Sequence, residues 1–417
     1  MARANSRDRD LRERAAAVIP GGMYGHQSTG LLPDDYPQFF ERGEGAHIWD
    51  ADGTRYLDFM CAYGPNLFGY ANPGIDAAFV RQLERGDTLT GPTGLMVELA
   101  EALTGMVTHA DWAIFCKNGT DATTMALTTA RAHTKRRKVI RAQGAYHGAL
   151  PWCTPRPSGV IETDRAHQIF CDYNDVASLE AAAAEAGDDL AAIFAAPFRH
   201  DAFIDQAEPD PAYAAAARAI CDRTGALLVV DEVRAGFRLS RDCSWSRIGV
   251  EPDLSTWGKC LANGHPLSAM LGNDKARKAA AAIYVTGSFW YQAATMAAAL
   301  ETLRLIRETD YLERITSLGE TLRSGLHARA QAAGFGLRQT GPSVMPLFLF
   351  DDDPDLRKGF CFGSEMLARG VYIHPWHNMF LCAAMTEADI TGALDAAEAA
   401  FAALKRQAPG LGPVEKL

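Results

Sequence analysis

The sequence predicts an α/β fold with a mostly parallel central sheet, and three observations support this class. The apolar run from Ala226 to Val230 stops abruptly at Asp231, and a short apolar run rich in β-branched residues is typical of a strand buried on both faces. Similar runs at 113–116, 138–140 and 191–196 alternate with helix-like segments, as in a layered α/β domain. The chain of 417 residues is long enough for two domains with a sizeable core.

Composition excludes several classes of protein. The net charge of -10 argues against a nucleic-acid partner, because surfaces that bind nucleic acid are usually basic. The sequence has no apolar run of about eighteen residues that would predict a membrane helix, and its start lacks the apolar core of a signal peptide. The nine cysteines form no CxxC pair, so neither a metal site nor a disulfide framework is predicted. We therefore expect a cytoplasmic protein with reduced thiols and no membrane partner.

The first part of the chain, 1–60, predicts an N-terminal segment and part of a small α+β domain. Residues 7–18 are charged and rich in alanine, which favours a helix. Two strand-like runs, 47–50 and 54–59, flank Asp52-Gly53. An Asp-Gly pair between such runs is a strong signal for a β-hairpin.

The middle part, 61–307, predicts the large domain, and its first chemical element is Asn118-Gly119-Thr120. This segment lies between a predicted strand and a predicted helix. A helix N-terminus that follows a glycine presents backbone N–H groups and a positive dipole end, which together suit a phosphate. An ordinary helix cap is the competing interpretation, because Asn, Thr and Asp are all good capping residues.

Asp231 and Lys259 are the predicted catalytic residues. Ligands in open α/β sheets bind at the carboxyl ends of the strands, and Asp231 ends the apolar run described above. Lys259 lies between Gly258 and a loop-like Ala-Asn-Gly-His-Pro segment, an unusual place for a solvated lysine. An amine that forms a Schiff base with an aldehyde, and a carboxylate that keeps a pyridine nitrogen protonated, suit pyridoxal 5'-phosphate.

The last part, 308–417, predicts a small C-terminal domain of helices and short strands. We expect helices over 312–333 and 387–406, and strands over 343–350 and from Val371 onward. Thr386 is the expected N-cap of the closing helix, with Asp389 three residues later in a box-like arrangement.

Two motifs carry a resemblance to a known family. The segment Asp231 to Arg238 reads Asp-Glu-Val-Arg-Ala-Gly-Phe-Arg, and the segment Pro252 to Lys259 ends in Gly-Lys. In this order they resemble the class III (fold type I) aminotransferases that depend on pyridoxal phosphate, and in particular the glutamate-1-semialdehyde aminomutase branch. The resemblance runs from about Val18 to about Leu404 and implies the fold type I of pyridoxal phosphate-dependent transferases.

The resemblance also implies roles for residues that contact the cofactor. Asn118, Gly119 and Thr120 match the family's phosphate loop with mild changes, and Val233 belongs to the aspartate motif. The ring of Tyr146 is expected to stack on the cofactor. For His147 we expect a structural or indirect role rather than a catalytic one.

A second subunit is implied in the same way. Ser288 takes the place of a family threonine that reaches the phosphate of the neighbouring subunit, with Thr286 as the alternate. The resemblance therefore implies a homodimer whose site lies at the interface.

Substrate contacts are harder to predict. Arg199 follows a strand where the sequence departs from the family, and a guanidinium suits a carboxylate, although a solvated loop arginine is the competing interpretation. Arg234 and Arg238 are rival candidates. His26 and His377, with His374, are expected either to shape a polar pocket or to be ordinary hydrogen-bonding residues.

The implied reaction is amino transfer between a small-molecule donor and a carbonyl acceptor. The donor is expected to be an amino acid, a β-amino acid, an amine or an amino sugar. The aminomutase branch has an arginine in the loop after its Pro-Gly-Gly, whereas no arginine occurs in 23–29 here, which favours transfer between molecules. One alternative is an aminomutase or epimerase that uses the same lysine. The other is a nucleotide-binding or non-catalytic α/β protein, which the absence of G-x-G-x-x-G and Walker motifs disfavours.

Overall fold

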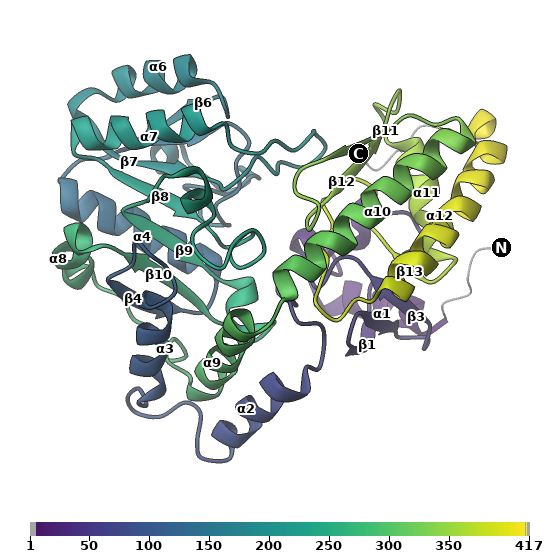
Figure 1. The fold of residues 1–417 in the computed structure, drawn as a ribbon, viewed down its shortest axis with the longest axis horizontal. Helices are drawn as coiled ribbons and strands as arrows, with labels where there is room; N and C mark the ends of the chain where they lie inside the picture. Colours follow the sequence, from purple (N-terminus) through teal and green to yellow (C-terminus); the bar gives the residue numbers. More distant parts are fainter. Residues whose placement is uncertain (1–5, 413, 415–417) are drawn as a thin grey trace. The chain divides into compact units, whose positions relative to one another are not determined.

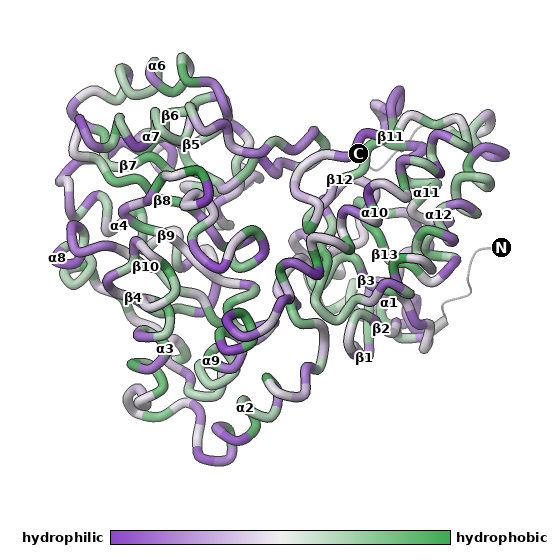
Figure 2. Tube along the Cα trace, in the orientation of Figure 1, coloured by the Kyte–Doolittle hydropathy of each residue, from purple (hydrophilic) through white to green (hydrophobic). Residues whose placement is uncertain are grey.

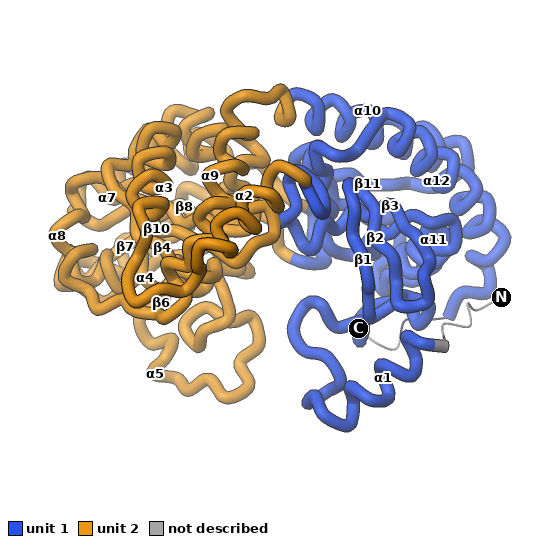
Figure 3. The backbone as a smooth tube through the Cα atoms, turned by 90° about the horizontal axis from the view of Figure 1, so that it is seen from below, with its two compact units in different colours: residues 1–72, 202–205, 313–417 blue, residues 73–201, 206–312 orange. Residues whose placement is uncertain are grey.

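The computed structural model describes residues 6–412 and 414. The chain forms two compact units (Figure 3): unit 1 comprises Met1–Asn72, Ala202–Asp205 and Glu313–Leu417, and unit 2 comprises Pro73–Asp201 and Gln206–Leu312. The predicted domain boundaries at 60/61 and 307/308 fall slightly earlier in the chain, and the two domains themselves stay a prediction. Residues 1–5, part of the segment on which the prediction of no signal peptide rests, lie outside the described residues.

Within the described residues, unit 2 is built on a seven-stranded sheet in the order β4-β10-β9-β8-β7-β5-β6 (Figure 1). From β6 through β5, β7 and β8 to β9 the pairings are parallel, which confirms the predicted α/β class. β10 runs antiparallel to both β4 and β9, a reversal that was not predicted. The strands are β4 (Trp112–Cys116), β5 (Lys138–Ala142), β6 (Gln168–Cys171), β7 (Leu190–Ala195), β8 (Leu227–Asp231), β9 (Leu254–Trp257) and β10 (Ser268–Gly272).

The core of unit 2 lies where helices cover this sheet. Every residue of β7, β8 and β9 is buried, and Figure 2 shows β7 and β8 as largely apolar. α4 (Gly119–Thr134) packs against β7 to β10, whereas α6 (Val176–Ala186) and α7 (Pro211–Thr224) pack against β5 to β8. The other helices of this unit are α2 (Pro73–Leu83), α3 (Leu95–Thr104), α5 (Glu162–Arg165), α8 (Asp274–Ala282) and α9 (Ala293–Glu308).

Unit 1 contains a four-stranded sheet, β1-β2-β3-β13, among its described residues. The predicted hairpin around Asp52-Gly53 is present as β2 and β3, which pair antiparallel, and β13 adds parallel to β3. The strands of the unit are β1 (Phe40–Glu44), β2 (His47–Asp50), β3 (Arg55–Asp58), β11 (Leu337–Thr340), β12 (Leu347–Phe350) and β13 (Val371–Tyr372). Its helices include α1 (Ser6–Val18), α11 (Arg357–Leu367) and α12 (Glu387–Gln407), and α10 (Tyr311–Ala333) leads into it.

The predicted C-terminal elements are present, but one strand begins later than expected, and α11 and β11 were not predicted. The strand expected over 343–350 begins only at Leu347, because Pro346 has no N–H for a ladder and Met345 N instead donates to Pro342 O in a turn (2.9 Å). The capping box of α12 is present: Asp389 N donates to Thr386 Oγ1 (3.2 Å), and Thr386 N donates to Asp389 Oδ2 (2.8 Å).

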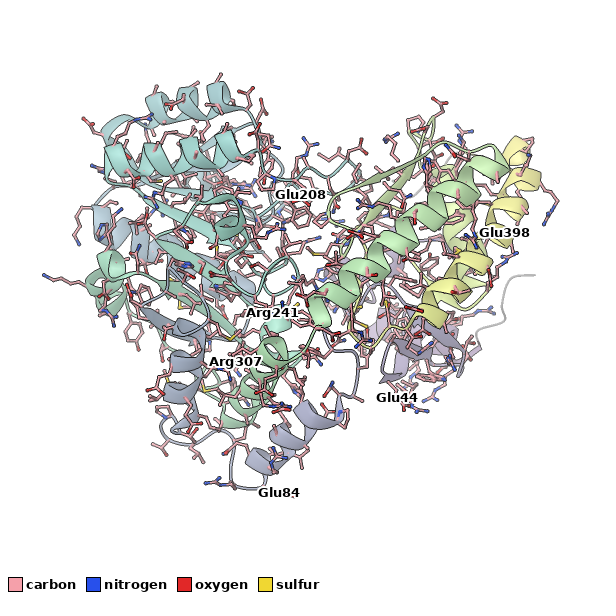
Figure 4. All side chains as sticks on the ribbon, in the orientation of Figure 1. Glu44, Glu84, Glu208, Arg241, Arg307 and Glu398 are labelled. Carbon is pink, nitrogen blue, oxygen red and sulfur yellow. The ribbon has the colours of Figure 1, made fainter. Side chains whose placement is uncertain are left out.

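Charged side chains have two different roles on this fold (Figure 4). Glu84 and Glu398 are solvent-exposed, so they contribute net charge and little stability. Arg241, by contrast, donates from Nε to Ile306 O (3.0 Å) and from Nη2 to Thr309 O (2.8 Å). It thereby binds carbonyl groups at the C-terminal end of α9, where a cation is favourable. In the part of the chain that the structure describes, no helix is long and apolar enough to span a bilayer.

Candidate active site

A cavity of about 180 Å³ lies in unit 2 where β8 and β9 end. Carboxyl ends of neighbouring parallel strands meet at one edge of a sheet, and Asp231 pairs in register with Thr256 there. Lys259 follows β9 by two residues. The cavity is lined by Asn118, Gly119, Thr120, Thr123, Tyr146, His147, Gly148, His200, Asp231, Val233, Arg234 and Lys259. The cavity therefore brings together the predicted lysine, the predicted carboxylate and the predicted phosphate loop.

The carboxylate of Asp231 is held in one orientation by three partners. Its Oδ1 accepts hydrogen bonds from Thr256 Oγ1 (2.8 Å) and from Val233 N (3.2 Å). Its Oδ2 lies 2.8 Å from His147 Nδ1. Because Asp231 is 7% exposed and still lines the cavity, its charge is directed at whatever the cavity binds.

His147 lies behind this carboxylate. Its ring is buried, and Thr123 Oγ1 donates to its backbone carbonyl oxygen (2.7 Å). Nε2 of the ring has no hydrogen-bond partner among residues 6–412 and 414. This placement is compatible with the expected indirect role for His147, because its ring contacts Asp231 (2.8 Å), and the role itself stays a prediction.

Lys259 begins the 3₁₀ turn η5 (Lys259–Ala262), which packs against α9. Its backbone is left-handed, with φ 46°. The preceding Gly258 packs closely on the next strand, since a Cβ there would lie 2.6 Å from Ser268 Oγ. Burial, aided by the positive charge of Arg234, lowers the pKa of Lys259 to about 8. A larger fraction of neutral amine is therefore available near neutral pH, as a nucleophilic lysine requires.

The N-terminus of α4 lines one end of the cavity with Asn118, Gly119 and Thr120. Asn118 is an N-cap, because its Oδ1 accepts from Asp121 N (3.0 Å). The capping interpretation is therefore confirmed, and the phosphate interpretation stays a prediction that a cap does not exclude. Two glycines let neighbouring side chains approach the backbone closely here. A Cβ on Gly119 would lie 2.6 Å from Val233 Cγ1, and a Cβ on Gly148 would lie 2.7 Å from Thr120 Oγ1. The first N–H groups of a helix have no intrahelical acceptor and suit an anion.

Tyr146, His200 and Arg234 also line the cavity. Tyr146 is 38% exposed, so one part of its ring is available to a ligand. Burial lowers the pKa of Arg234 to about 10, although the charges of Tyr146 and Asp231 oppose this shift. The guanidinium stays positive at neutral pH and places a cation in the cavity.

Several predicted residues do not line this cavity. Arg199 lies in the loop after β7, where its backbone N donates to Ala207 O (2.8 Å), and Ser288 is exposed on the segment between α8 and α9. His26 and His377 belong to unit 1, where their rings lie 4.6 and 5.5 Å from the ring of Tyr63. The roles of these four residues stay predictions.

Sequence reasoning missed His200, Thr123 and Thr256. A hydroxyl inside the buried strand β9 was a usable signal for Thr256, because buried polar groups need partners. His200 directly follows Arg199 in the segment that departs from the family, and the arginine was singled out in its place. No cluster of potential metal ligands occurs in the described chain.

The donor set of the cavity fits pyridoxal phosphate. Lys259 offers an amine for the aldehyde, Asp231 a carboxylate for the ring nitrogen, and the α4 N-terminus a cradle for the phosphate. Glycine at 119 and 148 lets Val233 and Thr120 approach the backbone closely at that end of the cavity. The chemistry of each group matches one functional group of the cofactor.

Comparisons with known proteins agree with this chemistry. The model of the family "Aminotransferase class-III" matches residues 32–386. An aminopentol aminotransferase of Sphingopyxis macrogoltabida is 57% identical over 98% of this chain and 97% of its own length. A glutamate-1-semialdehyde 2,1-aminomutase of Nitrosospira multiformis is 31% identical over 95% of this chain and 99% of its own. The solved pyridoxal phosphate internal aldimine form of the FumI protein from Sphingopyxis sp. MTA144 is 57% identical, with a TM-score of 0.97 over 98% of both chains.

Proposed function

Since the chain belongs to the class-III aminotransferase family, we propose that its amino donor is a polyhydroxylated amine of the aminopentol kind. The protein is an aminotransferase of fold type I, and pyridoxal phosphate is its cofactor. The observation that carries the proposed donor is the identity of 57% to an aminopentol aminotransferase over 98% of the chain. This proposal narrows the set of amino donors expected from the sequence, which also included amino acids, β-amino acids and amino sugars, to an amine.

The residues of the cavity support amino transfer in distinct ways. Pyridoxal phosphate, when bound, takes up the amino group and accepts the electron pair released at the substrate carbon. Asp231 holds a proton at the ring nitrogen, and His147 and Thr256 keep its carboxylate oriented. Lys259 Nζ would hold the cofactor through its amine and, once free, would take the proton from the amine-bearing carbon of the substrate, a task suited to an amine with a pKa of about 8.

Arg234 is the proposed contact for a negatively charged acceptor. A hydroxylated amine carries no carboxylate, whereas a 2-oxo acid acceptor does. A guanidinium in the same cavity as Lys259 would bind that carboxylate in bidentate fashion.

We favour transfer between molecules over intramolecular rearrangement. The relative with 57% identity is named an aminotransferase, whereas the aminomutase reported above is 31% identical. The loop 23–29 also lacks the arginine expected of the aminomutase branch. Membership of that branch is therefore the less supported alternative.

The enzyme is further proposed to act as a homodimer in the cytoplasm. Tyr284 and Phe289, which flank Ser288, are 91% and 59% exposed, and large apolar side chains gathered on one segment suit burial against a second copy. None of the nine cysteines forms a disulfide within the described chain, which suits a reducing compartment. Light scattering tests the homodimer, and a monomer that is fully active would exclude it. Cell fractionation tests the cytoplasmic location.

A half-reaction tests the proposed donor. The holoenzyme is mixed without acceptor with an aminopentol, a matched amine lacking the hydroxyls, and a set of amino acids, while the cofactor spectrum and the carbonyl product are followed. We expect the aminopentol to convert the cofactor fastest and pyruvate to restore it. Conversion by amino acids alone would refute the proposed donor, and rearrangement of a single substrate without acceptor would favour the aminomutase.

A further inference from the structure

The long loop between β5 and α5 forms one wall of the cavity that contains Lys259. The loop comprises residues 143–161, all of which the structure describes, and it includes no helix or strand. Tyr146, His147 and Gly148 of this loop line the cavity. A loop of this length inside a compact domain is usually either functional or disordered. Contacts outside the loop must therefore hold this wall in place if its side chains are to meet a ligand.

Two threonines near the start of α4 bond the loop directly. Ala149 N donates to Thr120 Oγ1 (3.2 Å), and Thr123 Oγ1 donates to the backbone oxygen of His147 (2.7 Å). Both threonines also line the cavity. A substitution at either one would therefore change the ligand site and the loop at the same time.

Trp152 makes a third bond from the loop to α4, and this bond lies away from the cavity. Its Nε1 donates to Thr124 Oγ1 (3.1 Å), and neither of these two described residues lines the cavity. The half-buried indole packs on the core of the sheet and lies edge-on to Phe194 of β7, with ring centroids 5.5 Å apart. Trp152 therefore fixes the loop at a point that a ligand in the cavity does not touch.

Phe194 connects this point to the carboxylate of the site. Its ring is 2% exposed and also lies edge-on to His147, with centroids 5.8 Å apart. His147 Nδ1 in turn lies 2.8 Å from Asp231 Oδ2. Trp152, Phe194 and His147 thus form a continuous row of rings that ends at Asp231. Because interiors are close-packed, a displacement of the indole would be transmitted along this row.

We propose that Trp152 is a positioning residue that, through its bond to Thr124, holds Tyr146 and His147 in the conformation that binds pyridoxal phosphate. The proposal rests on the assignment of the Lys259 cavity as the cofactor site. Without the bond, part of the population has this wall of the cavity displaced. The apparent affinity for the cofactor then falls by the fraction of molecules that stay competent to bind it.

The test is a titration of the full-length protein, freed of cofactor, with pyridoxal phosphate, together with amide hydrogen exchange over 146–154. Trp152→Phe keeps a ring against Phe194 but has no N–H. We expect it to raise the Kd about fivefold, the effect of one lost hydrogen bond, and to accelerate exchange over 146–154.

Variants of Thr124 examine the same bond from its other end. Thr124→Val removes the acceptor and should raise the Kd as much as Trp152→Phe does. The double variant should show no further rise, since both substitutions remove one and the same bond. Thr124→Ser keeps the hydroxyl and should keep the wild-type Kd. If Trp152→Phe does not fold, the two Thr124 variants still test the proposal.

Trp112→Phe is the matched control. Trp112 of β4 belongs to the same core, and its Nε1 donates to Asn273 O (2.8 Å), but it lies outside the loop and does not line the cavity. Its replacement should lower the free energy of unfolding in urea and leave the Kd unchanged. The comparison separates a loss of packing from a loss of positioning.

Two results would overturn the proposal. One is an unchanged Kd in Trp152→Phe and Thr124→Val with a loss of stability like that of Trp112→Phe, which would make Trp152 a packing residue only. The other is additive effects of the two substitutions, which would show that they act through different contacts. The titration uses no amine, so its result does not depend on the proposed donor. Borohydride reduction that links the cofactor to a residue other than Lys259 would refute the site assignment instead.

Discussion

Two buried aspartates, one in each unit, end a strand and yet have different surroundings. Asp231 ends β8 in unit 2 and Asp58 ends β3 in unit 1, and they are 7% and 1% exposed. Asp231 lines a cavity that also contains Lys259 and Arg234. Asp58 accepts from Tyr70 Oη (2.6 Å) and Met60 N (2.7 Å), both neutral donors, and burial raises its pKa to about 6.

The carboxylate of Asp58 serves the backbone that follows it. Cys61, Ala62 and Tyr63 have φ values of 45°, 55° and 63°, a left-handed run that is unfavourable for residues other than glycine. Hydrogen bonds from this turn to Asp58 stabilise the ionised carboxylate against the cost of burial. A buried carboxylate at a strand end therefore does not by itself mark an active site. Asp231 differs from Asp58 because it lines a cavity together with the cationic side chains of Lys259 and Arg234.

The largest expected effect concerns Lys259. Lys259→Ala should lower turnover by at least about 10⁴-fold, because both the covalent link and the base for proton transfer are lost. Lys117→Met is the matched control: burial also lowers the pKa of Lys117 to about 8, but this lysine does not line the cavity and donates to Pro266 O (2.9 Å). Steady-state assays should show near wild-type turnover in the control; equal losses in both variants would refute the assignment of Lys259.

The two aspartates can be compared directly. Asp231→Asn should lower kcat by about 100- to 1000-fold, the usual loss when a preorganised charge is removed from an active site. Asp58→Asn should keep kcat within about threefold, since Asp58 acts on a turn and only one hydrogen bond is altered. Comparable losses of kcat in the two variants would contradict the distinction drawn between the units.

A smaller effect is expected at Thr256. Thr256→Val removes the hydroxyl that donates to Asp231 Oδ1 at 2.8 Å and nearly conserves volume. One lost hydrogen bond of about 1 kcal/mol should lower kcat about fivefold while cofactor affinity stays nearly constant. Thr129→Val, at a buried threonine of α4 that does not line the cavity, is the control. An effect in Thr129→Val as large as in Thr256→Val would indicate a general packing defect.

The last expected effect concerns stability rather than turnover, and it is a pH dependence that comes from Asp58. Its pKa is raised from 3.8 to about 6 in the folded state, so the folded state binds the proton more tightly than the unfolded state does. The free energy of unfolding should therefore fall as pH rises from about 4 to about 6, by roughly 2 kcal/mol from this group. Urea unfolding should show a flatter pH profile for Asp58→Asn than for the wild type. Parallel profiles would exclude this contribution.

The sequence alone determined the fold class and the main chemical groups of the candidate site. Asp231, Lys259 and the Asn118-Gly119-Thr120 turn each belong to a short local pattern, a strand end or a helix start, whose geometry depends on neighbouring residues in the chain. In a mostly parallel sheet the carboxyl ends of the strands lie at one edge. The sequence could therefore predict that Asp231, Lys259 and the Asn118-Gly119-Thr120 turn lie near one another.

Tertiary structure alone decided which other residues contact Asp231 and line the cavity beside Lys259. Thr256 reaches Asp231 through the register of β9 on β8, and His200 enters the cavity from the loop after β7. The reversed strand β10 depends on its pairing with β4 and β9. Such contacts join positions far apart in the chain, and they are set by register and burial rather than by local propensity.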